Sequence, residues 1–100
     1  MSQNVFRYQF APELDTAEIE VTLVLAIIAT ESLHGETAAQ LGISHCFDAE
    51  KRLCVIDASD QVGHDFNALF AGFLRREFGS LAFRAHRVAI SQPHALAPAA

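Results

Sequence analysis

The sequence predicts an α+β fold in which two helices cover one face of a four-stranded antiparallel sheet. Two observations indicate the helices: an apolar run at residues 14–35 with helix start and stop signals, and a segment at residues 59–79 with one apolar helical face. Segments that alternate between apolar and polar residues precede, separate and follow the helices, and they indicate the sheet. One hundred residues, about half of them apolar, suffice for one domain with a single core.

The first predicted strand, Val5–Phe10, leads into the first predicted helix at residues 14–35. Asp15 is suited to cap the start of this helix, and Gly35 is suited to end it. Nine of the eleven residues from 19 to 29 are apolar, so a buried strand is the alternative. The start and stop signals favour the helix.

The same apolar run is too short for a membrane span and contains Glu20, and its acidic flanks do not fit a signal peptide. We therefore expect a cytoplasmic protein without a membrane partner, whose two cysteines are thiols. The net charge of −5 argues against a nucleic-acid partner.

A hairpin is predicted after the first helix. Its first strand runs from Ala39 to Phe47, with a bend or bulge at Gly42, and the return strand runs from Arg52 to Ala58. The connection between them is polar.

The register of the hairpin has two alternatives. An even-numbered loop pairs Phe47 with Arg52 and places Cys46 and Cys54 on opposite faces of the sheet. A three-residue loop pairs Asp48 with Arg52 and places the two cysteines directly across from each other. We favour the three-residue loop, because it pairs opposite charges and gathers apolar side chains.

The second predicted helix begins near Ser59 or Asp60 and ends at Gly79. Gly72 lies inside it, and we interpret this glycine as a point where another backbone comes close. The apolar positions, which define one helical face, are Val62, Phe66, Leu69, Phe70, Phe73, Leu74 and Phe78.

The last predicted strand, Leu81 to Ile90, completes a β-α-β-β-α-β order, which is the ferredoxin-like plan with strand order 4-1-3-2. We expect residues 1–90 to form this single domain and residues 91–100 to form a disordered tail.

The first helix is apolar on more sides than one sheet face requires. Beyond the stripe expected to face the sheet, four large aliphatic residues spread onto its flanks, and exposed apolar patches usually mark an interface. We therefore expect a homodimer or larger assembly, or contact with another protein, through Val21, Val24, Leu25 and Ile28.

Charge is distributed unevenly, with −8 over residues 1–65 and +3 over residues 66–100. If the last strand pairs with the first, Arg7, Arg84 and His86 come together, while Arg87 points to the other face. This group is a candidate site for an anion or for an acidic protein surface.

Two metal or redox hypotheses are weaker. Glu31 and His34 lie one helical turn apart, a spacing that serves metal sites when it occurs in pairs, but here it occurs once. Cys46 and Cys54 could bind a soft metal if they face each other. We expect no cofactor.

Catalysis by His64, near Asp57, Asp60 and Asp65, is the least favoured hypothesis, because no nucleophile motif accompanies these residues. The sequence thus favours a non-catalytic, self-associating module, with a small-ligand or metal-binding domain as the alternative.

Overall fold

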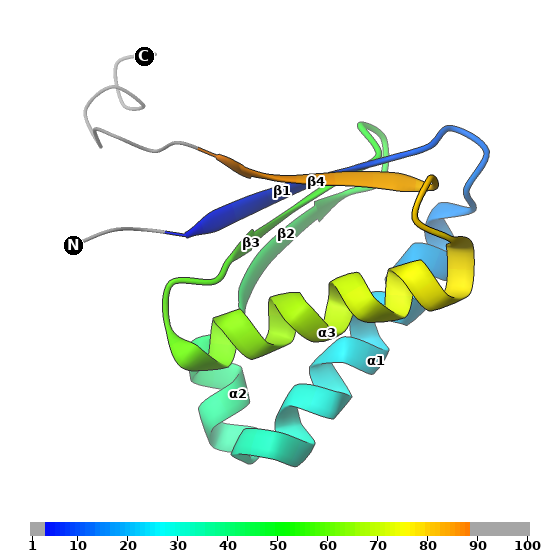
Figure 1. Ribbon diagram of the computed structural model, residues 1–100. Coiled ribbons are helices and arrows are strands. Elements are labelled where there is room, and N and C mark those ends of the chain that lie inside the picture. Colours follow the sequence, from blue (N-terminus) through cyan, green and yellow to red (C-terminus); the bar gives the residue numbers. More distant parts are fainter. Residues whose placement is uncertain (1–3, 89–100) are drawn as a thin grey trace.

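The computed structural model describes residues 4–88, which form an α+β fold with three helices and a four-stranded antiparallel sheet (Figure 1). The helices α1 and α3 lie on the same side of the sheet. In chain order the elements are β1 (Val5–Phe10), α1 (Thr16–His34), α2 (Glu36–Gly42), β2 (Ser44–Asp48), β3 (Leu53–Asp57), α3 (Gln61–Phe78) and β4 (Phe83–Val88).

The strand order is β2-β3-β1-β4, with every neighbouring pair antiparallel, which confirms the predicted sheet. β2 and β4 are therefore the two edge strands. The predicted last two residues of β4 and the predicted tail lie outside the described residues. Within residues 4–88, no helix is long and apolar enough to cross a membrane.

The two-helix order is wrong, because α2 occupies the start of the segment predicted as a strand from Ala39 to Phe47. A strand would place Ala39 and Leu41 on one face, but Ala39 is 1% exposed and Leu41 is 84% exposed. The segment is rich in good helix formers, and β2 begins only at Ser44.

Both long helices begin and end where the sequence predicts. The Asp15 carboxylate accepts a hydrogen bond from the Ala17 N–H at 2.9 Å, and the Asp60 carboxylate accepts one from the Gly63 N–H at 2.7 Å. Gly35 and Gly79 follow the two helices with φ of 92° and 88°, a conformation that favours glycine.

The core lies between the sheet and the pair α1 and α3. Alternate residues of β1 and β3 face the helices, and each helix contributes one buried stripe. The buried core residues are Tyr8, Phe10, Ile19, Leu23, Ala26, Cys54, Ile56, Phe66, Phe70 and Leu74.

Tyr8 is the central polar group of this core. Its hydroxyl donates to the Asn67 side-chain oxygen at 2.6 Å, and its ring centroid lies 5.1 Å from that of Phe70. Burial raises the pKa of the Tyr8 hydroxyl well above its usual range, so the group stays neutral and can donate. The bond ties β1 to the middle of α3.

The hairpin register favoured from the sequence is wrong. Asp48 pairs with Leu53 and Phe47 with Cys54, so four residues form the loop. This even-numbered loop places Cys46 on the open sheet face and Cys54 in the core, where the prediction had set them across from each other.

Arg52 explains the longer loop. Its backbone is left-handed, with a φ of 56°, and its carbonyl accepts a hydrogen bond from the Phe10 N–H at 3.0 Å. Its guanidinium donates to the carbonyls of Ala11 and Leu14, which connect β1 to α1. Arg52 therefore joins the hairpin to the start of α1 instead of pairing within the hairpin.

Gly72 does not mark a close approach of backbones. A Cβ atom built there meets no atom within 4 Å, whereas one built on Gly42 would lie 2.6 Å from the Val62 Cβ. The close helix contact is thus between α2 and α3, at a glycine that was interpreted as a bend in a strand.

Candidate functional site

The largest unexplained feature is the side of α1 that points away from the sheet. Val21, Val24, Leu25 and Ile28 are 59%, 51%, 52% and 51% exposed. We call these four residues the α1 outer face. Because the opposite side of α1 fills the core, the outer face is additional apolar surface with no partner among residues 4–88.

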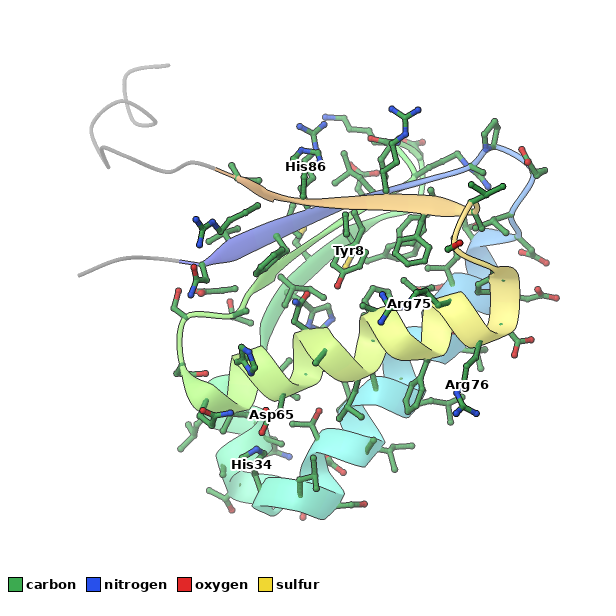
Figure 2. All side chains as sticks on the ribbon, viewed as in Figure 1. Tyr8, His34, Asp65, Arg75, Arg76 and His86 are labelled. Carbon is green, nitrogen blue, oxygen red and sulfur yellow. The ribbon has the colours of Figure 1, made fainter. Side chains whose placement is uncertain are left out.

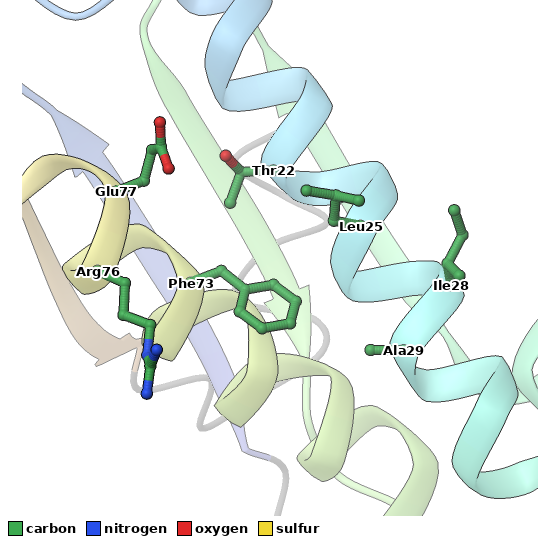
Figure 3. A pocket seen from close by; sticks show the side chains of 7 residues that line it. All are labelled: Thr22, Leu25, Ile28, Ala29, Phe73, Arg76 and Glu77. Carbon is green, nitrogen blue, oxygen red and sulfur yellow. The ribbon is translucent and has the colours of Figure 1, made fainter.

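An open groove of about 320 Å³ runs beside the α1 outer face, between α1 and α3 (Figure 3). Leu25 and Ile28 line it from α1, and the ring of Phe73 lines it from α3. Arg76 and Glu77 form its charged border. The groove thus combines an apolar floor with one positive and one negative side chain.

A second hollow of about 430 Å³ lies on the other flank of the outer face. It is lined by Ala17, Glu20, Val21, Val24 and Leu25, all of α1. Leu25 borders both hollows, so the apolar surface is continuous from one hollow to the other.

The sequence predicted the α1 outer face but missed the contribution of α3. Figure 2 shows Arg75 on the sheet side of α3 and Arg76 on the opposite side. The signal was present, because Arg76 and Glu77 follow Phe73 by three and four residues and therefore share its side of the helix.

The open face of the sheet brings three predicted binding residues together. Arg7 pairs with His86 across β1 and β4, and Gln9 pairs with Arg84, so Arg7, Arg84 and His86 point to one side. All three are exposed, and Figure 2 shows His86 on the side away from the helices. This cluster forms a basic strip on the open face of the sheet, over β1 and the edge strand β4.

Arg87 lies on the other face of β4, as the alternation predicts, and donates to the Asn4 side-chain oxygen at 2.9 Å. The cysteines do not form one site. Burial raises the pKa of the Cys54 thiol to about 12, which keeps it protonated in the core. Cys46 is exposed and shares the open face with the basic strip.

His34 contacts Asp65, and within residues 4–88 no hydrogen bond or ion pair joins it to Glu31. The His34 Nε2 lies 2.7 Å from the Asp65 Oδ2, which joins the end of α1 to the start of α3 (Figure 2). Hydrogen bonds from His34 and then His64 lower the pKa of the Asp65 carboxyl. No sequence signal pointed to this contact, since its residues are 31 positions apart. Within residues 4–88, no three potential metal ligands cluster.

The acidic residues near His64 are engaged in local structure. Asp60 caps α3, and the Asp57 carboxylate accepts a hydrogen bond from the Ser59 N–H at 3.0 Å. The Ser59 hydroxyl oxygen in turn accepts one from the Asn4 N–H. These contacts account for the cluster that the sequence offered as a candidate for catalysis.

No known protein family matches this chain, and searches among curated proteins and among solved structures find no match. The interpretation of the α1 outer face and of the basic strip therefore depends on the geometry of this structure alone.

Proposed function

We propose that this protein is a non-catalytic module that associates with a second copy of itself through the α1 outer face. The observation that carries the proposal is the exposure of four large aliphatic side chains on successive turns of one helix. If buried, such side chains contribute about 25 cal/mol per Å² of apolar surface removed from water. That gain supports a state in which the face is covered.

The charges that border the groove support a second copy of the chain as the partner. Arg76 and Glu77 line the same groove, and neither forms an ion pair within residues 4–88. A surface that carries adjacent charges of both signs can be complementary to itself. A strongly acidic or basic partner would leave one of the two charges opposed by a like charge.

Light scattering and native mass spectrometry at a series of concentrations test this proposal. We expect a dimer at micromolar concentration, and we expect Leu25→Glu to raise its dissociation constant at least tenfold. Leu41→Glu on α2 is the matched control, because Leu41 is 84% exposed outside the face and should leave the dimer intact. A wild-type monomer at high micromolar concentration contradicts the proposal.

We also propose that the fold is a ferredoxin-like plan with one inserted helix. The strand order and the placement of α1 and α3 on one sheet face support this relation. The helix α2 is the addition, and it lengthens the connection between α1 and β2.

A second candidate function rests on the basic strip of Arg7, Arg84 and His86. Within residues 4–88 no carboxylate forms an ion pair with either arginine, and guanidinium groups bind carboxylates and phosphates well. Titration with inorganic phosphate, followed by NMR, should shift β1 and β4 amides in the wild type. Arg7→Gln with Arg84→Gln should abolish those shifts, whereas Arg76→Gln should not. Equal shifts in all variants would count against the site.

A further inference from the structure

We infer that the two copies of α1 pack antiparallel, about a two-fold axis that passes near Val24 and Leu25. This inference rests on the proposed self-association and specifies its geometry. It comes from the spacing of the exposed apolar residues, the direction of the α1 dipole, and the two charges that border the groove.

The spacing of the exposed residues fits a helix–helix contact. Ala17, Val21, Val24 and Ile28 follow one another at intervals of four, three and four residues, and all four are exposed. This alternation is the apolar seam that two packed helices share. Centred between Val24 and Leu25, an antiparallel pair sets Val21 opposite the partner's Ile28, and the seam is covered from Val21 to Ile28.

The dipoles of the two copies of α1 favour the antiparallel direction, because a parallel pair aligns them and an antiparallel pair opposes them. The acidic residues do not discriminate between the two directions. A parallel pair brings together the two copies of Glu20, which lies beside the seam, and the antiparallel register sets Glu18 opposite the partner's Glu31.

The groove border completes the contact. In a two-fold arrangement each groove border faces the same border of the other copy, so Arg76 meets the partner's Glu77 and Glu77 meets the partner's Arg76. Figure 3 shows both side chains on α3 beside the groove. The two ion pairs are identical by symmetry, and they select this pairing over alternatives in which like charges meet.

Disulfide trapping distinguishes the two directions. In a Cys46→Ser background, Val24→Cys should form a disulfide-linked dimer under mild oxidation, because the two copies of this position lie near the axis. Val21→Cys should not link to itself, since its copies are about 10 Å apart along the helix axis and a disulfide needs Cα atoms within about 7 Å. A mixture of Val21→Cys and Ile28→Cys should link. Leu41→Cys is the control for random collision.

Charge exchange tests the border. Arg76→Glu and Glu77→Arg should each weaken the dimer, and the double variant should restore it, because it rebuilds both pairs with reversed signs. Arg75→Glu is the matched control, since it makes the same charge change on the sheet side of α3. Self-linking of both Val21→Cys and Ile28→Cys, in a protein that does dimerise, would overturn the antiparallel geometry and leave the proposed self-association standing. A monomeric wild type would remove both.

Discussion

The helices α1 and α3 lie side by side on one sheet face, yet they expose different kinds of side chain to solvent. They have 19 and 18 residues, each begins after a capping aspartate, and each is followed by a glycine. The outward side of α3 carries polar and charged residues, whereas the outward side of α1 carries large aliphatic ones. Covering a sheet requires one apolar side of a helix, so packing against the sheet does not account for the second apolar side of α1.

The two sides of α1 should respond very differently to the same substitution. Leu23→Ala, at a residue that is 5% exposed in the core, should lower the free energy of unfolding by about 2–5 kcal/mol. Leu25→Ala, at a residue that is 52% exposed, should change monomer stability by less than about 1 kcal/mol.

Urea unfolding at several protein concentrations measures this difference. If the proposed dimer forms, the wild-type midpoint should rise with protein concentration because association would stabilise the folded chain, and Leu25→Ala should weaken that dependence. Equal losses at both positions, with no concentration dependence, would mean that the outer side of α1 is packed within a single chain.

Two glycines allow a closely packed helix surface, at Gly42, to be compared with an open one, at Gly72. Gly72→Ala should stabilise α3 by about 1 kcal/mol, because alanine is the better helix former and the added Cβ meets no atom within 4 Å. Gly42→Ala should destabilise the fold by about 1–3 kcal/mol, since the added Cβ would overlap Val62. Thermal unfolding of both variants measures the signs, and a stabilising Gly42→Ala would show that α2 and α3 are not in close contact.

The contact between His34 and Asp65 should make the joint between α1 and α3 sensitive to acid. The pKa of Asp65 is lowered by folding, so its contribution is present above about pH 4, near the ordinary aspartate value, and is lost as the pH falls through the lowered pKa. Asp65→Asn should therefore reduce the loss of stability as the pH falls below about 4.

Urea midpoints at a series of pH values measure this effect, and Glu13→Gln in the exposed turn before α1 is the control. If Asp65→Asn and the wild type lose stability in parallel below pH 4, the lowered pKa of Asp65 does not contribute to the acid response.

Features that depend on local patterns could be predicted from the sequence. The strand Val5–Phe10, the capped ends of α1 and α3, and the strand order all follow from periodicity, capping residues and the usual handedness of connections. The exposed apolar surface of α1 was also predictable, because its apolar residues occupy more than one side of the helix.

Features decided by contacts between distant segments could not be predicted. The alternation of Ala39 and Leu41 fits a strand. The segment instead forms the short helix α2, whose last residue, Gly42, packs closely against Val62 of α3. The hairpin loop extends to four residues because Arg52 bonds to the start of α1, which no local rule for hairpins contains. The contact of His34 with Asp65 is equally remote in sequence.

The edge strand β4 has a consequence for the size of an assembly. Arg84, His86 and Arg87 are all exposed along it. A second β4 laid alongside would bring arginines from two chains close together, so repulsion opposes extension of the sheet from molecule to molecule. The proposed two-fold contact through α1 would bury its own surface and end with two copies. The charged residues of β4 thus disfavour strand-to-strand extension at this edge of the sheet.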